Sequence, residues 1–141
     1  MTFGPEVLLE RLEALETAAN TPDRYVIALS GGLDSTALAH ALAETRGRHG
    51  KSLLAVHVDH QLQAESARWT DYCRDLAARF GIEFVAERVA VDNTDSLGIE
   101  AAAREARYAA LRRHMRGADW LLSAHHRNDQ AETLLLNLMR G

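Results

Sequence analysis

The sequence predicts an α/β fold, a doubly wound parallel sheet with helices on both faces. Short apolar stretches alternate with amphipathic helical stretches, which is the order of a parallel sheet with helical crossovers. The apolar stretches are continuous rather than alternating, as in strands that are buried on both faces. With 141 residues, of which 47% are hydrophobic and 26% charged, the chain can bury its own core as one domain.

The predicted elements follow one another along the chain. After Pro5, leucines recur at helical spacing and indicate an opening helix. Four buried strands are expected at residues 25–29, 53–58, 84–89 and 120–124. Between them, helices are expected up to about residue 46, over 69–80 and over 99–115, each followed closely by a glycine that can end it. A last helix is expected from about Asp129.

Residues that directly follow the strands are the candidates for a ligand site. In sheets of this type, a ligand binds beyond the carboxyl ends of the strands, where the strand order reverses. Three of these ends carry polar residues, at 30–35, 57–60 and 125–129. We therefore expect the functional site at this edge of the sheet.

The most informative stretch, called the 30–35 loop below, consists of Ser30, Gly31, Gly32, Leu33, Asp34 and Ser35. Two glycines between a strand and a helix let backbone amides turn toward an anion, and the helix N-terminus adds partial positive charge. Ser30 and Ser35 offer hydroxyl donors to phosphate oxygens. Asp34 would repel a phosphate unless a divalent cation lay between them, so the combination indicates a magnesium–pyrophosphate site. The alternative is a Gly-Gly turn in which Asp34 and Ser35 cap the helix.

Two other predicted helices carry charged residues on one face. Asp129 and Glu132 lie three residues apart in the last predicted helix, where a capping box would explain them without any ligand. Glu100, Arg104 and Arg107 form a stripe at i, i+4 and i+7, for which a solvated salt-bridge face is the alternative.

Two further residues have a structural interpretation. His57 lies near the end of the second predicted strand, where a histidine is more often a satisfied structural residue than a ligand. Cys73 lies on the apolar stripe of a predicted helix and is expected to pack in the core rather than act as a nucleophile. Because it is the single cysteine, it excludes an internal disulfide, a cysteine-based zinc site and an iron–sulfur cluster, and it favours a reducing, cytoplasmic compartment.

The charge balance limits the classes of partner. The chain has 16 basic and 20 acidic residues, a net charge of −4. A domain that binds nucleic acid by itself is normally basic, so this balance argues against a stand-alone nucleic-acid binder but not against a catalytic domain with a basic partner domain. No apolar stretch reaches the roughly 18–20 residues of a membrane span, so no membrane partner is expected.

Four segments resemble known signatures, in the order of one family. The 30–35 loop resembles the signature loop of the PP-loop ATPases, which adenylate a substrate and release pyrophosphate. It lacks the lysine of a Walker A loop, so γ-phosphate transfer is not implied. Residues 125–133 resemble the His-x-x-Asp-Asp-Gln-x-Glu-Thr segment of the tRNA(Ile)-lysidine synthetases. Residues 98–108 are similar to the third signature of that family, and residues 57–60 to its segment at the second strand.

This resemblance implies that residues 1–141 are an N-terminal PP-loop ATP-binding domain with the adenine nucleotide alpha-hydrolase-like fold, lacking the last strand or strands and the tRNA-binding domains. An enzyme of this family uses ATP to activate the C2 oxygen of the wobble cytidine in a tRNA(Ile) with a CAU anticodon. Pyrophosphate leaves, and the ε-amine of free lysine displaces AMP to form lysidine, which changes codon specificity from AUG to AUA. ATP, Mg²⁺, L-lysine and this tRNA are therefore the expected ligands.

The resemblance also implies a role for each matching residue. The 30–35 loop and His57 would bind ATP, and Asp34 would hold Mg²⁺. Arg104 would supply a fixed cation for the negative charge that develops at the adenylate. Asp129 would be catalytic beside Asp34 and Arg104, and with Glu132 it would hold the ammonium group of lysine. The same segments supply three further candidates, namely Glu100, Arg107 and His125.

Three positions depart from the pattern of the family. Gln61 stands where glycine is common, Gln63 where arginine is common, and Asn128 replaces the first aspartate of the usual pair. A phosphate or tRNA contact by that arginine is therefore not carried over to this chain. The alternatives are another PP-loop adenylating enzyme and a non-catalytic module that binds adenine nucleotides without pyrophosphate exchange. The tRNA cytidine thiolases, which need several cysteines, are excluded.

Overall fold

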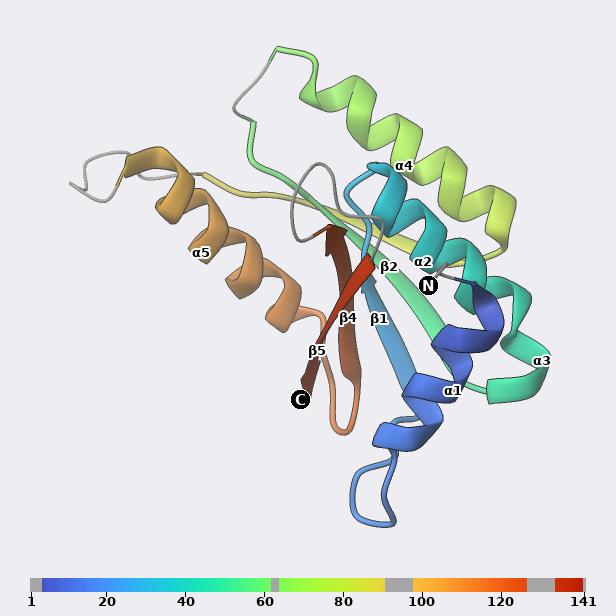
Figure 1. The fold of residues 1–141 in the computed structure, drawn as a ribbon. Helices are drawn as coiled ribbons and strands as arrows, with labels where there is room; N and C mark the ends of the chain where they lie inside the picture. The colour runs from blue at the N-terminus through green and yellow to red at the C-terminus, as the bar shows by residue number, and fades with distance from the viewer. Residues whose placement is uncertain (1–3, 62–63, 91–97, 127–133, 141) are drawn as a thin grey trace.

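One five-stranded sheet forms the centre of the computed structural model, which describes residues 4–61, 64–90, 98–126 and 134–140 (Figure 1). The strand order is β3-β2-β1-β4-β5. The strands are β1 (Arg24–Ala28), β2 (Ser52–Asp59), β3 (Glu83–Arg88), β4 (Trp120–His126) and β5 (Leu134–Arg140). Strands β1 to β4 are parallel, which confirms the predicted sheet, whereas β5 runs antiparallel to β4.

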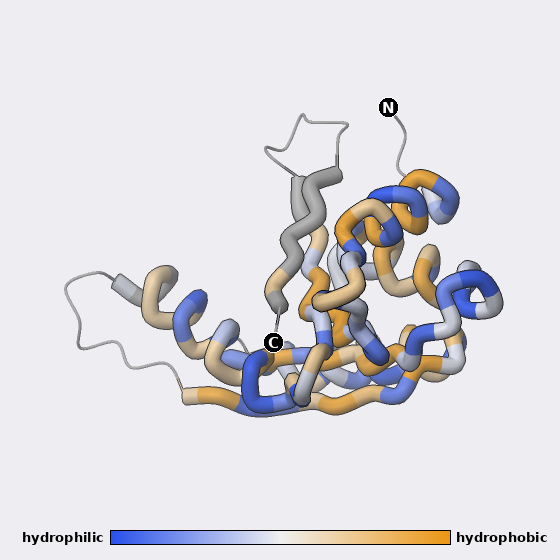
Figure 2. Tube along the Cα trace, turned by 90° about the horizontal axis from the view of Figure 1, so that it is seen from below, coloured by the Kyte–Doolittle hydropathy of each residue, from blue (hydrophilic) through white to orange (hydrophobic). Residues whose placement is uncertain are grey.

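Helices cover both faces of this sheet. They are α1 (Pro5–Leu15), α2 (Leu33–Glu44), α3 (Arg46–His49), α4 (Ser66–Phe80) and α5 (Gly98–Arg113). Apart from the short α3 and the last segment, the predicted elements agree with the structure to within three residues. In Figure 2, hydrophobic colouring dominates the strands and alternates with hydrophilic colouring along the helices. Within the described segments, no helix is long and apolar enough to cross a membrane.

The two faces of the sheet bury separate cores. Successive side chains of a strand point to opposite faces, so Tyr25 and Ile27 belong to one core, which α1, α2 and α4 cover. Cys73 of α4 is also part of this core. Val26 and Ala28 join the other core, under α5. Since α2 leads from β1 to β2 on one face and α5 leads to β4 on the other, the strand order reverses at β1. The carboxyl end of β1 is therefore where a ligand is expected.

The prediction of a last helix from about Asp129 is wrong for residues 134–140, which form β5. The register pairs Leu134 with His126 and Arg140 with Trp120. An apolar run of this length fits a helix face and a strand alike, so periodicity does not decide between them. In the structure, pairing with β5 supplies hydrogen-bond partners to the edge of β4. Residues 127–133 lie outside the described part of the chain.

Candidate functional site

The 30–35 loop is held by hydrogen bonds among its own residues. The backbone N–H of Ser30 donates to Ser35 Oγ at 3.0 Å, and the two serine hydroxyl oxygens lie 2.9 Å apart. The N–H of Gly32 donates to Ser30 Oγ at 3.3 Å. Ser35 is only 3% exposed. The two hydroxyls that the sequence predicts as phosphate donors therefore organise the loop, and they give it a defined shape before any ligand binds.

Helix α2 begins within this loop, at Leu33, without a side-chain cap. Its N-cap is Gly32, which makes no side-chain hydrogen bond, and the first turn contains Asp34. The alternative in which Asp34 and Ser35 cap the helix is therefore not what the structure contains, because both residues lie inside the helix. The positive end of the helix dipole and its first N–H groups face the carboxyl edge of the sheet. The side chain of Leu33 is 88% exposed beside them.

The end of β2 supplies a second wall. His57 is 5% exposed, and its Nδ1 lies 2.9 Å from the carbonyl oxygen of Leu29. Since a carbonyl only accepts, Nδ1 carries the proton, and in the neutral ring Nε2 is left as an acceptor. His60 Nδ1 is buried without a hydrogen-bond partner in the described part of the chain. Burial and then the guanidinium of Arg107 lower the pKa of His60 below its ordinary 6.5, so this ring is neutral near pH 7.

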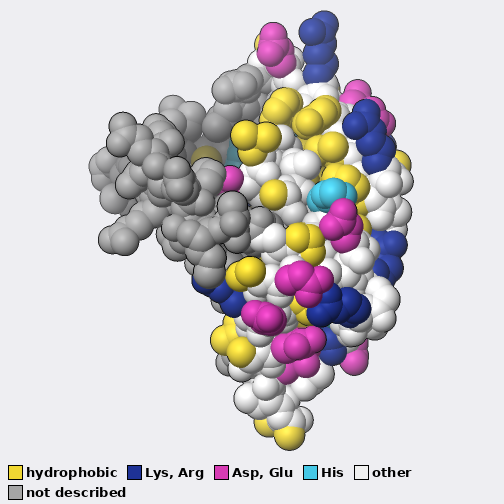
Figure 3. All heavy atoms as spheres, turned by 45° about the vertical axis from the view of Figure 1, so that its right-hand side comes forward, with side chains coloured by type: hydrophobic (Ala, Val, Ile, Leu, Met, Phe, Trp, Pro, Cys, Tyr) yellow, Lys and Arg dark blue, Asp and Glu magenta, His cyan; other side chains and the backbone are white. Residues whose placement is uncertain are grey.

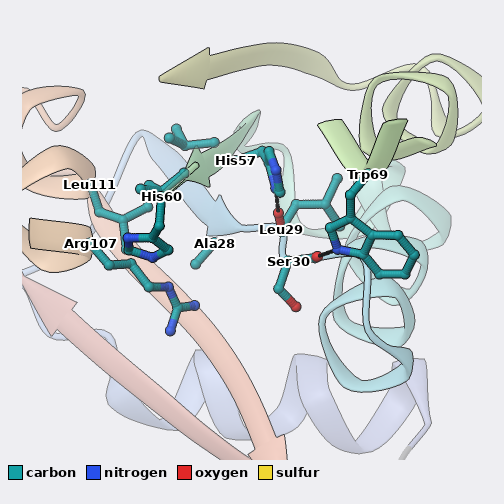
Figure 4. A pocket seen from close by; sticks show the side chains of 10 residues that line it. Ala28, Leu29, Ser30, His57, His60, Trp69, Arg107 and Leu111 are labelled. Carbon is teal, nitrogen blue, oxygen red and sulfur yellow. Dashed lines mark hydrogen bonds between the residues drawn. The ribbon is translucent and has the colours of Figure 1, made fainter. Parts of the chain in front are cut away.

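Two adjoining cavities open at this edge, and they share His57, Val58, His60 and Trp69 in their walls. The first, of about 310 Å³, lies between the end of β1 and helix α5, which contributes Arg107 and Leu111 (Figure 4). The second, of about 620 Å³, extends from β2 to Trp69 and Tyr72 of α4. An apolar cavity with a few polar groups at a topological switch point is the usual form of a small-molecule site.

Helix α4 contributes exposed aromatic rings to the second cavity. Trp69 is 48% exposed and Tyr72 43%, and their rings stack with centroids 5.2 Å apart. Figure 3 shows hydrophobic side chains gathered on the upper part of the helical face, where α4 lies. Trp69 is not among the site residues that the sequence predicts. Its position early in the helix after β2, near the carboxyl edge, is the signal that could have identified it.

The arginines of α5 are divided between the cavity and the solvent. Arg107 lines the first cavity, whereas Arg104 does not contribute to the lining of either cavity and lies exposed, with its guanidinium carbon 5.6 Å from the centre of the Tyr108 ring. Glu100 lies in α5 and His125 in β4, but the described part of the chain does not include their side chains. The remaining predicted positions lie outside the described residues, namely Gln63, Asn128, Asp129 and Glu132.

Gln61, where the family resemblance leads us to expect glycine, has a left-handed backbone conformation. Its φ of +57° is in the region where glycine is favoured. Here the conformation is supported by the N–H of Gln61, which donates to Asp59 Oδ1 at 2.8 Å. Asp59 is buried, with 5% exposure, so this turn is anchored in the sheet.

Comparisons with known proteins agree with this geometry. The family described as PP-loop domain matches residues 6–141. A tRNA(Ile)-lysidine synthase of Alkalilimnicola ehrlichii is 44% identical over 139 residues, covering 99% of this chain and 30% of that protein. Proteins of the same name from Haemophilus influenzae strain PittEE and Aromatoleum aromaticum are 45% and 46% identical, over 86% and 90% of this chain. The chain spans about 30% of the length of these relatives.

A solved structure from the universal stress protein family of Burkholderia pseudomallei is 20% identical and covers 72% of this chain and 96% of that one. The TM-score of this match is 0.35. The family match, in contrast, leaves out only the first five residues and contains the 30–35 loop at the switch point of the sheet. The chain therefore belongs to the family of PP-loop domains.

Proposed function

We propose that this chain is the ATP-binding and adenylating part of a tRNA(Ile)-lysidine synthase. The observation that carries the proposal is the 30–35 loop, in which two glycines and an uncapped helix N-terminus directly follow Ser30, a residue that lines the cavity at the switch point. A PP-loop domain implies ATP binding. The lysidine synthase activity is inferred from relatives that are about 45% identical and carry that name.

In this proposal, ATP activates the C2 oxygen of the wobble cytidine of a tRNA(Ile) with a CAU anticodon, and free lysine then displaces AMP. His57 and the apolar wall of the first cavity would hold the adenosine. Arg104 and Arg107 are the candidates for the cation that stabilises charge at the adenylate, and Arg107 has the stronger support because it lines the cavity. Asp129 and Glu132 would bind the lysine ammonium, with Glu100 and His125 nearby in the same signatures.

Mg²⁺ fits the residues present at the loop only as an ion shared with the nucleotide. Among the described residues, no group of three His, Cys, Asp or Glu side chains could hold a metal ion. Asp34 is a single carboxylate in the first turn of α2. Mg²⁺ is typically held by one or two carboxylates together with phosphate oxygens and water, so Asp34 would be its protein ligand. When bound, the ion would neutralise the leaving pyrophosphate.

Replacing Asp34 with alanine tests this arrangement. Asp34→Ala is expected to weaken Mg²⁺-dependent ATP binding by more than about tenfold, because the phosphate charge loses the cation that the carboxylate holds. The measurement is calorimetric titration of both proteins with ATP and Mg²⁺. As a control, titration with ATP in the presence of a chelator should show Asp34→Ala binding at least as tightly as the wild type, because without the cation the carboxylate only repels the phosphates. Equal affinity with Mg²⁺ present would contradict the proposed role of Asp34.

Pyrophosphate exchange distinguishes an adenylating enzyme from a module that only binds ATP. A non-catalytic module would bind ATP without exchange of labelled pyrophosphate whatever is added, whereas the adenylating enzyme exchanges it when the tRNA is present.

The 141-residue chain alone is expected to transfer no labelled lysine to tRNA, because its net charge of −4 offers little to hold a polyanion. In a longer protein that is active, Glu132→Gln should raise the KM for lysine more than the KM for ATP.

Cysteine chemistry has no support in this site. Cys73 is buried in the core, and burial raises the pKa of its thiol to about 11. A thiol with so high a pKa is a poor nucleophile near neutral pH. This supports adenylation with an amine acceptor over sulfur transfer, and a buried unpaired thiol is compatible with our proposal of a cytoplasmic protein.

A further inference from the structure

The peptide group between Ser30 and Gly31 is held by a residue from another element. Trp69 of α4, which is 39 positions later in the chain, donates its indole N–H to the carbonyl oxygen of Ser30, with Nε1 and the oxygen 2.5 Å apart. Figure 4 shows the indole lying beside Ser30, with this hydrogen bond between them. The helix on the far side of the second cavity thus reaches the 30–35 loop directly.

The same indole lies against Gly31. A Cβ atom on Gly31 would be 2.8 Å from Cε2 of Trp69 and 2.9 Å from Cζ2 and Nε1, closer than real Cβ contacts. Gly31 also has a φ of +90°, a conformation that residues with a side chain rarely adopt. Both the indole contact and the backbone conformation therefore require glycine at this position.

The direction of one backbone amide follows from this contact. In a trans peptide the C=O and the N–H of the same unit point in opposite directions. Because the carbonyl of Ser30 points to Trp69, the N–H of Gly31 points away from α4. That N–H makes no hydrogen bond to any described residue. Glycine tolerates either orientation of its peptide unit, so the loop sequence by itself does not select this one.

We infer that Trp69 is a positioning residue for nucleotide binding, which fixes the Ser30–Gly31 peptide so that the Gly31 N–H is free for a phosphate oxygen. This inference rests on the proposed ATP site. The indole is itself held in place by stacking on Tyr72, one turn further along α4. Trp69 also lines both cavities, so a ligand in the second cavity would contact the residue that holds the 30–35 loop.

The test compares Trp69→Phe, which keeps a ring but loses the N–H, with the matched control Thr70→Val. Thr70 is the next residue of α4, lines neither cavity, and donates its hydroxyl only to the Ser66 carbonyl of its own helix at 3.1 Å. Loss of one hydrogen bond predicts Mg²⁺-ATP binding about 3- to about 10-fold weaker for Trp69→Phe, and an unchanged Kd for Thr70→Val. Thermal unfolding should be similar for both variants, because neither side chain is buried. Equal Kd values for Trp69→Phe and the wild type would overturn the inference.

A double-mutant cycle tests the contact with Gly31. Gly31→Ala should weaken ATP binding strongly in the wild type and at least about 5-fold less in a Trp69→Ala background, because the clash with the indole is then gone and only the φ strain remains. If the fold-changes in Kd for the two single substitutions multiply to that of the double substitution within about twofold, the contact is contradicted. In the ligand-free protein, Trp69→Phe should also shift the Gly31 amide resonance in NMR spectra, and an unshifted resonance would overturn the positioning role. If Trp69→Phe shifts this resonance but the wild-type protein does not bind ATP, the proposed function is overturned instead.

Discussion

Substitution of Asp119 by alanine should destabilise the sheet on which the candidate site is built. Asp119 immediately precedes β4 and is 5% exposed. Its Oδ2 accepts hydrogen bonds from Arg24 Nε at 3.0 Å, from Arg24 Nη2 at 2.6 Å and from the N–H of Arg116 at 2.9 Å. Arg24 is the first residue of β1. The pair thus joins the starts of the two strands between which the strand order reverses, and helps to set their register.

The size of the effect follows from the burial of the partner. In Asp119→Ala, the Arg24 guanidinium, with a side chain only 13% exposed, would lose its counter-charge. Removing one member of a buried ion pair costs about 3–5 kcal/mol. Arg24 Nη2 still donates to the carbonyl of His114 at 2.9 Å, so the low end applies, about 3 kcal/mol. For a chain of this size, that corresponds to a fall in Tm of about 10 °C.

Urea and thermal unfolding measure this loss, and the chain contains a control. Arg74 and Asp71 of α4 form a pair of similar length, 2.7 Å, but their side chains are 53% and 71% exposed. Asp71→Ala should leave the free energy of unfolding nearly unchanged, because exposed pairs are screened by water. Substituting Arg24 with methionine in the Asp119→Ala protein should recover part of the loss, since no buried charge is then unpaired. Similar losses for Asp119→Ala and Asp71→Ala would refute the reasoning.

Two further predictions concern stability near the site. Gln61→Gly should stabilise the protein by up to about 1 kcal/mol in urea unfolding, because it relieves the left-handed strain at φ +57°, whereas Gln61→Ala should not. For Glu87, burial raises the pKa, but hydrogen bonds from Arg113 and His114 and their charges lower it overall below 4.5. Its contribution is therefore present above about pH 4.5 and lost as the pH falls through the lowered pKa, so the stability difference between wild type and Glu87→Gln should shrink in acid. A difference that is constant with pH would contradict this.

The strands and the 30–35 loop could be predicted because their signals are local. A continuous apolar run such as residues 25–29 has few alternatives when it lies between a turn and a Gly-Gly pair. Part of the loop conformation depends on contacts within six residues, such as the bond between the Ser30 N–H and Ser35 Oγ.

Interactions between distant elements could not be predicted in the same way. The contact between Trp69 and Ser30 depends on how α4 docks on the sheet, and an aromatic residue on a helix stripe is usually a core residue. The sequence does not predict β5, because the leucines after residue 133 fit the period of a helix and that of a strand. Its pairing with β4 depends on a free strand edge, a property of the whole sheet rather than of the segment.

The two arginines of α5 show how packing decides between residues that the sequence treats alike. Arg104 and Arg107 lie on one charged stripe, but the rotation of α5 is fixed by Leu111, which is 1% exposed in the core on that face. Arg107 is one turn before Leu111, and it lines the same cavity. Both guanidinium groups lie beside the Tyr108 ring, at 5.6 Å for Arg104 and 5.9 Å for Arg107, so contact with this ring does not separate them. The buried position of Leu111 one turn after Arg107 is what brings Arg107 to the cavity beside His60, where burial and then the charge of Arg107 lower the pKa of that ring.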